Sequence, residues 1–204
     1  GSAPMLLLAR ADLPANTLQE FIGWLGKNRD KASYGSAGVG SISHYGCVML
    51  LSSIKQNATH VPYKGVAPAM NDLMGGQTDF MCDQTTTALP QVAGGRIKAI
   101  AVLSKERLAS LPRTGTATEA GYPLDVRSWN ALFAPRGTPA PVLATLTQAL
   151  QNAVGDAGLI RQLQAVGVEL PKPADTTSAA IAQRIAIGLR DDVPALKAKG
   201  EYLD

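Results

Sequence analysis

The feature that most constrains the fold is an alternation of short apolar runs with helix-forming segments. Runs of strand length occur at residues 5–9, 32–34, 60–63, 79–83 and 97–103. Segments with a helical spacing of apolar residues lie between them, at residues 17–27, 43–55, 67–74 and 87–93. Glycine pairs at 75–76 and 94–95 end the last two of these segments. This order predicts an α/β fold with mostly parallel sheets.

The sequence changes in character after Pro123. We expect a strand over residues 126–133, a long helix over 140–154, a shorter helix over 159–166, a brief strand over 168–170 and a terminal helix over 177–199. Gly188 and Pro194 fall inside the terminal helix, where both residue types disfavour helical backbone.

Composition excludes several classes of protein. The 204 residues are 46% hydrophobic and 17% charged, unlike a disordered chain or a coiled coil. A net charge of +3 and an aromatic content of 5% disfavour nucleic-acid binding. No apolar stretch approaches the length of about 18 residues that a membrane-spanning helix requires, so we expect no membrane span.

The two cysteines and two histidines are too few for a four-cysteine zinc site or a multi-histidine metal site. We therefore expect no metal and no cofactor. Cys47 and Cys82 either form a disulfide or are two small buried hydrophobic side chains, and the sequence leaves both alternatives open.

A glycine- and serine-rich turn, residues 36–41, connects an expected strand to an expected helix. Glycine permits positive φ and a close approach of the backbone to a ligand. Free N–H groups in such a turn and at the following helix N-terminus form a site for a carboxylate or a phosphate. The alternative is a plain turn with a serine N-cap. The spacing fits neither a P-loop nor a dinucleotide-binding fingerprint.

Further polar residues lie near expected strand ends. His44, just inside the helix, either contacts a ligand or packs and caps the helix. Asp83 closes a strand and either contacts a ligand or caps the next helix. Lys64 either attracts an anion or is solvated, and Trp129 either lines a cleft or packs. His60 is expected to be structural.

Enzyme signatures are sparse. The sequence contains no Gly-x-Ser-x-Gly motif, and neither cysteine lies beside an evident base. Ser41 and His44 are three residues apart, a spacing that the start of a helix explains more simply than a catalytic triad. We therefore expect no enzyme and no catalytic residue.

Several segments together resemble one family, the substrate-binding proteins of tripartite tricarboxylate transporters, also called the Bordetella uptake (Bug) family. The resemblance spans nearly the whole chain. It rests on residues 34–41 with His44, 60–65, 68–69, 73–77, 79–83 with 89–90, 95–102, 119–121, and Trp129 with 134–139. Residues 113–116 depart from the family pattern in a surface-type segment.

This resemblance implies a type II periplasmic binding fold of two lobes that closes on a small organic carboxylate. It also implies a periplasmic location, with the signal peptide outside this chain, and membrane permease components as partners. The expected ligand-binding residues are Ser36, Ala37, Gly38, Val39, Gly40, Ser41 and His44 on one wall, and Asp83, Gln84 and Thr85 on the other. Family members are about half as long again, so we expect part of one lobe to be absent from these 204 residues.

On this interpretation, residues 1–10 form a hinge strand and residues 11–125 form the complete second lobe. Residues 126–204 contain the other hinge strand and the C-terminal part of the first lobe. Two alternative functions remain open: a sensor module that presents a carboxylate to a membrane receptor, and an enzyme that uses the loop to bind a phosphorylated or carboxylated substrate.

Overall fold

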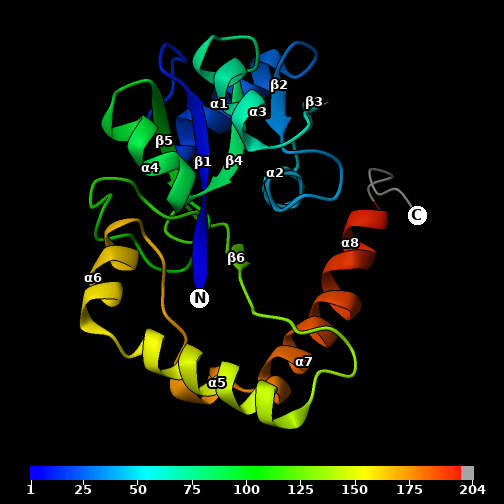
Figure 1. Ribbon diagram of the computed structural model, residues 1–204. Helices are drawn as coiled ribbons and strands as arrows, with labels where there is room; N and C mark the ends of the chain where they lie inside the picture. Colours follow the sequence, from blue (N-terminus) through cyan, green and yellow to red (C-terminus); the bar gives the residue numbers. More distant parts are fainter. Residues whose placement is uncertain (199–204) are drawn as a thin grey trace.

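A mixed β-sheet organises the first part of the chain. In the computed structural model, which describes residues 1–198, the strand order is β3-β2-β4-β1-β5 (Figure 1). The strands are β1 (Ser2–Arg10), β2 (Ser33–Ser36), β3 (Thr59–Pro62), β4 (Phe80–Gln84) and β5 (Ile97–Val102). β2 pairs in parallel with β3 and β4, whereas β1 is antiparallel to both β4 and β5.

The α/β class is therefore confirmed, but the expectation of a mostly parallel sheet is wrong. The reason is the path of β1. Its first residues pair with β6 (Arg127–Trp129) in the second part of the molecule. β1 then enters the main sheet from that end and runs opposite to its two neighbours. The apolar run at residues 5–9 indicated a buried strand correctly, since Met5 to Ala9 are fully buried.

Helices cover both faces of this sheet. On one face, α1 (Leu18–Asn28) and α2 (Ile42–Ser53) pack with Met5 and Leu7 of β1. On the other face, α3 (Val66–Met74) and α4 (Thr85–Ala93) pack with Leu6 and Leu8. Successive residues of β1 thus enter two separate apolar clusters, as the period of two along a strand requires.

The helix boundaries follow local signals in the sequence. The Thr17 hydroxyl accepts from the N–H of Glu20, and the Glu20 carboxylate accepts from the N–H of Asn16 at 2.7 Å. This arrangement is close to a capping box. The glycine pairs end α3 and α4 as expected.

The second part of the chain is mainly helical and elongated (Figure 1). It contains β6, α5 (Ala140–Val154), α6 (Ala157–Ala165), a 3₁₀ turn (Pro173–Thr176), α7 (Ser178–Ile187), a π-turn (Gly188–Asp192) and α8 (Val193–Lys197). The expected strand over 126–133 is shorter, and residues 168–170 contribute one bridge, between Glu169 and Ser2. The expected terminal helix is interrupted after α7, and its last residue, Lys199, lies outside the described residues.

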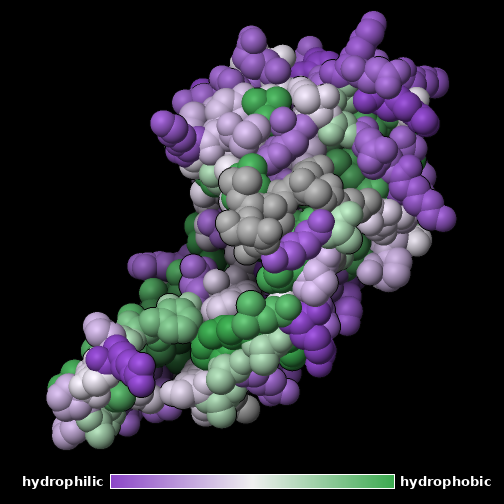
Figure 2. All heavy atoms as spheres, turned by 90° about the vertical axis from the view of Figure 1, so that its right-hand side faces the viewer, coloured by the Kyte–Doolittle hydropathy of each residue, from purple (hydrophilic) through white to green (hydrophobic). Residues whose placement is uncertain are grey.

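These helices expose apolar side chains. No residue of α5, α6 or α7 is buried in the described part of the chain. Figure 2 shows apolar surface gathered on the lower part of the molecule, whereas the upper part is mostly hydrophilic. The exposed large side chains there include Leu132, Phe133, Val142, Leu143, Leu146, Leu150, Ile185, Ile187 and Leu189.

Candidate functional site

The loop of residues 36–41 lies at the carboxyl edge of the parallel strands. It connects the end of β2 to the N-terminus of α2. β4 is the parallel neighbour of β2. The carboxyl end of β4, which contains Asp83, therefore lies at the same edge of the sheet. The expectation that both segments lie at carboxyl ends of adjacent strands is confirmed.

The loop backbone requires glycine at two positions. Gly38 has φ +122° and Gly40 has φ +77°, both in the region that L side chains rarely adopt. A Cβ atom at Gly38 would also lie 3.2 Å from the carbonyl oxygen of Tyr63, in the segment after β3. Two backbone bonds hold the loop to that segment, from Tyr63 N to Ser36 O at 3.0 Å and from Gly65 N to Ala37 O at 3.2 Å.

Most N–H groups of the loop already have acceptors nearby, at 2.8–3.1 Å. The bonds run from Ala37 N to Ser43 Oγ, Gly38 N to Ser36 Oγ, Gly40 N to His44 Nδ1 and Ser41 N to Gly38 O. The expectation that the loop presents free N–H groups is therefore wrong for these four in this conformation. Their acceptors are side chains and a carbonyl supplied by the same strand-to-helix connection.

Two N–H groups remain available to a ligand. Within residues 1–198, no acceptor is bonded to the N–H of Val39, Ile42 or Ser43, and Val39 and Ile42 are at least partly exposed, whereas Ser43 is fully buried. Ile42 and Ser43 are the first two residues of α2, where the helix provides no internal partner and the helix dipole favours an anion. Val39 is 40% exposed and lies at the tip of the loop. An anion at this point can therefore be bound by backbone donors alone.

The two histidines support the loop from below. The rings of His44 and His60 stack at 4.3 Å, and His60 stacks on Tyr34 at 4.7 Å. His60 Nε2 lies 2.7 Å from Ser36 Oγ, and His44 Nδ1 accepts from Gly40 N–H, which places the His44 proton on Nε2. His44 is fully buried. Contact between His44 and a ligand stays a prediction.

Sequence reasoning treated His60 as structural and missed its bond to Ser36. The pairing of β2 with β3 places His60 directly opposite Tyr34. Its ring therefore reaches the strand end from which the loop begins. The α/β pattern favours parallel pairing of these two strands. Assuming that pairing would have placed His60 beside the loop.

Asp83 lies at the expected strand end but is fully buried. Its Oδ2 accepts from the Thr87 hydroxyl in the first turn of α4, and its Oδ1 has no partner in the described part of the chain. Burial raises the pKa of this carboxyl, since desolvation disfavours the ionised form. Because Thr87 lies in the first turn of α4, its contact with Asp83 resembles the helix-capping role that the sequence allowed. A ligand role for Asp83 stays a prediction.

Gln84 and Thr85 connect the two parts of the molecule. Gln84 Oε1 accepts from the Ser128 hydroxyl at 2.8 Å, and Thr85 Oγ1 donates to the Gly167 carbonyl at 3.1 Å. Gly167 has φ +74°, and a Cβ atom there would lie 2.7 Å from Thr85 Cβ. These two candidate residues therefore already hold β4 and α4 against the second part of the chain.

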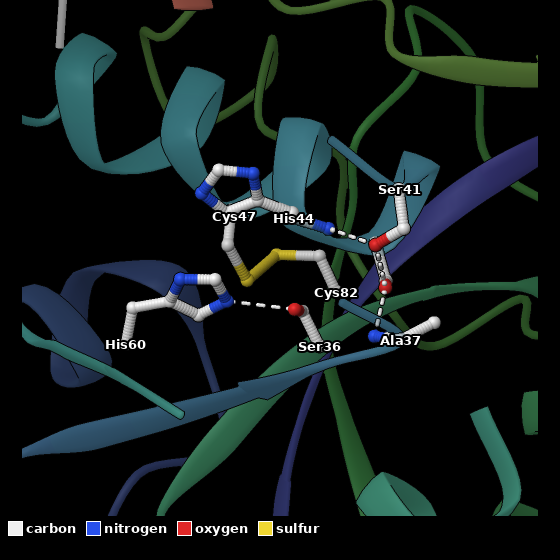
Figure 3. The surroundings of a disulfide bond; sticks show 8 residues. Ser36, Ala37, Ser41, His44, Cys47, His60 and Cys82 are labelled. Atoms are coloured by element: carbon white, nitrogen blue, oxygen red, sulfur yellow. Dashed lines mark hydrogen bonds between the residues drawn. A yellow bond between two sulfur atoms is a disulfide. The ribbon is translucent and has the colours of Figure 1, made fainter. Parts of the chain in front are cut away.

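Cys47 and Cys82 form a disulfide beside the two histidines (Figure 3). Of the two alternatives that the sequence left open, the structure has the bonded one, with the Cα atoms 5.3 Å apart. Two other candidates lie in less distinctive surroundings. Lys64 is exposed, and Trp129 is stacked with the Arg184 guanidinium, 5.7 Å from the ring centre.

In residues 1–198, no cluster of three or more His, Cys, Asp or Glu side chains is arranged to hold a metal ion. None of the helices in that part of the chain combines the length and apolarity that crossing a bilayer requires.

Comparison with known proteins gives consistent matches. A family model described as the tripartite tricarboxylate transporter family receptor matches residues 1–186. A UPF0065 protein of Agrobacterium vitis is 36% identical over 183 residues, which are 89% of this chain and 53% of that protein. The chain spans about half the length of the curated relatives it matches.

Two solved structures share the fold at similar identity. MatC of Rhodopseudomonas palustris, solved with bound malate, is 35% identical with a TM-score of 0.88, over 96% of this chain and 67% of that one. The periplasmic binding protein BugD is 36% identical with a TM-score of 0.90, over 98% of this chain and 67% of that one.

Proposed function

Because the chain belongs to the tripartite tricarboxylate transporter receptor family, we propose that it supplies the ligand-binding loop of an extracytoplasmic solute-binding protein. That protein captures a small organic carboxylate and delivers it to the permease components of a membrane transporter. The observation that carries the proposal is the pair of available N–H groups of Val39 and Ile42, at the N-terminus of α2. Bound malate in the similar protein MatC supports the carboxylate class.

The carboxylate binds at the exposed tip of the loop in this proposal. One oxygen accepts from the Val39 N–H and the other from the first turn of α2, where the helix dipole adds a favourable field. Gly40 is exposed, so its N–H turns toward the ligand if its bond to His44 Nδ1 opens. Ser41 brings a hydroxyl group close to the same point, 3.0 Å from the hydroxyl of the buried Ser43.

The contact between Ser36 and His60 raises the alternative of an enzyme, because an imidazole can activate a neighbouring serine hydroxyl as a nucleophile. The burial of Ser36 argues against it. The side chain is fully buried, and its Oγ already accepts from the Gly38 N–H. The hydroxyl therefore serves the loop backbone, and we propose that the protein binds its ligand without turnover.

The domain division is part of this proposal. Residues 1–10 serve as a hinge strand and residues 11–125 form one lobe, whose core also contains Met5 to Ala9 of that strand. Residues 126–204 contribute the second hinge strand and helices of the other lobe. The periplasm is the location that fits this function. Sensing by a membrane receptor is the remaining alternative, and adjacent permease genes or an adjacent sensor-kinase gene distinguish the two.

Calorimetry on the intact protein tests the function. We expect malate, or another di- or tricarboxylate, to bind with micromolar or tighter affinity and to be recovered unchanged. Gly40→Val should abolish binding, because a branched side chain disfavours φ +77° and blocks the exposed tip. Gly121→Val is the control, since Gly121 has φ +91° outside the loop. Undiminished affinity in Gly40→Val, or turnover of the ligand, contradicts the proposal.

A further inference from the structure

The disulfide joins the two elements that carry the candidate ligand residues. Cys47 lies in α2, one helical turn beyond His44, and Cys82 lies in β4, directly before Asp83. Both cysteines are fully buried. Figure 3 shows the bond beside the rings of His44 and His60, with Ser36, Ala37 and Ser41 on its other side. The bond therefore lies next to the loop rather than at a distant edge of the core.

The two halves of α2 are held in different ways. The C-terminal half buries Val48, Leu50 and Leu51, of which Leu50 and Leu51 belong to the apolar cluster between α2 and the sheet. The N-terminal half buries Ser43, His44 and Gly46, which offer little apolar area, and its Ile42 and Tyr45 are only partly buried against the same cluster. Cys47 is the point where the first half meets the second. The C-terminal half is therefore held by fully or nearly fully buried apolar side chains, and the N-terminal half by apolar side chains that are partly exposed.

Gly46 lets the N-terminal half lie close to β4. A Cβ atom at Gly46 would be 3.1 Å from Cys82 Cβ and 3.4 Å from the terminal carbon of Met5. The helix and the strand thus approach with no bulky side chain between them at this point. A covalent bond across the same gap replaces the packing that larger side chains would otherwise provide.

A continuous chain of contacts leads from the disulfide to the loop. Cys47 is bonded to Cys82 and lies about one helical turn along α2 from Ser43 and His44. Those two side chains accept from the N–H groups of Ala37 and Gly40, at 2.8 and 3.1 Å. A rotation or shift of the first turn of α2 would break both bonds, because hydrogen bonds depend steeply on distance and angle.

We propose that Cys47 and Cys82 are positioning residues for ligand binding: their disulfide holds the first turn of α2, and through Ser43 and His44 the loop of residues 36–41, in the geometry that receives the carboxylate. This inference rests on the proposed function. It goes beyond it by assigning part of the affinity to a bond that does not touch the ligand. A preorganised loop loses less conformational entropy when the ligand binds.

The test compares the intact protein with the double variant Cys47→Ala/Cys82→Ala by hydrogen–deuterium exchange and calorimetry. We expect amide exchange in residues 37–46 to become about tenfold faster, with exchange in α3 and β5 unchanged. We expect the dissociation constant for malate, measured well below the unfolding temperature, to weaken about tenfold as the loop loses its preorganisation.

The matched control is Leu73→Ala in α3, a fully buried residue of the apolar cluster on the other face of the sheet. It lowers the melting temperature without touching α2. A merely structural disulfide predicts that both variants lower the melting temperature and that neither changes exchange in residues 37–46 or malate affinity. That pattern overturns the proposal, as does equal loosening of the loop in both variants.

Two further arms keep the test decisive. If the double alanine variant does not fold, wild-type protein unfolded, reduced and refolded with a phosphine reductant gives the same comparison without any substitution. If the unmodified protein binds no carboxylate, the proposed function fails by itself. The exchange of residues 37–46 then still decides whether the disulfide positions the loop.

Discussion

The two parts of the molecule bury their apolar side chains to very different extents. In the sheet region, Leu7, Phe21 and Phe80 are fully buried between β1, β4 and α1. In the helical region, Leu146 is 40% exposed and Phe133 is 65% exposed. Residues of both regions show the same amphipathic pattern, so the difference arises from what each helix has to pack against.

The helices α1 and α5 differ in what their apolar faces contact. On α1, Leu18, Phe21 and Leu25 form one face, and that face meets a sheet. Leu143, Leu146 and Leu150 form the corresponding face of α5, and they remain exposed. An amphipathic helix therefore requires a covering layer, and in residues 1–198 only the first region contains one.

The largest difference in stability is expected when one leucine in each region is replaced by alanine. Leu7→Ala should lower the free energy of unfolding by about 2–5 kcal/mol, because it leaves a cavity between two packed layers. Leu146→Ala should cost less than about 1 kcal/mol, because that side chain has little packing to lose. Urea unfolding measures both. A similar cost at the two positions would mean that the α5 face is covered in solution, for example by a second copy of the chain.

A smaller effect is expected at the junction of the two regions. Gly167→Ala should destabilise the protein by about 1–3 kcal/mol, because the new methyl group meets Thr85 while φ stays positive. Gly137→Ala is the control, with φ +88° and no atom within 4 Å of the new Cβ. Thermal unfolding measures the difference between the variants. Equal losses would show that the junction tolerates the clash and that only backbone strain matters.

The smallest effect concerns a hydrogen bond between the sheet region and the C-terminal end of the helical region. The Tyr45 hydroxyl donates to Asp192 Oδ1 at 2.7 Å, linking α2 to the π-turn. Burial, and then the Asp192 carboxylate, raise the pKa of Tyr45 above its ordinary 10.0. The stability from this contact is therefore complete below about pH 10 and is lost as the pH rises further.

Tyr45→Phe should cost at most about 1 kcal/mol at neutral pH, since the contact is partly solvated. The loss of stability above pH 10 should also become smaller in this variant. Chemical unfolding at pH 7 and between pH 9 and 11 checks both expectations. An unchanged alkaline profile would indicate that Tyr45 does not link the two regions in solution.

Much of the candidate site could be predicted from the sequence, because the signals are local. Glycines at 38 and 40 in a strand-to-helix turn, followed by Ser41 as N-cap, predicted the loop and its place at the sheet edge. The state of its N–H groups could not be predicted. The acceptors Ser43 and His44 reach back to the loop only in the three-dimensional geometry of the first turn of α2.

The sequence by itself determined the order of the elements in the sheet region, the ends of its helices to within about two residues, and the α/β class. Those properties depend on hydrophobic periodicity and on capping within a few residues. Tertiary structure decided the reversed direction of β1, the pairing of Cys47 with Cys82 and the contact of His60 with Ser36. Each of these joins residues far apart in the chain. Local patterns specify which face of an element is apolar, whereas only the packing of the whole chain decides which partner that face meets.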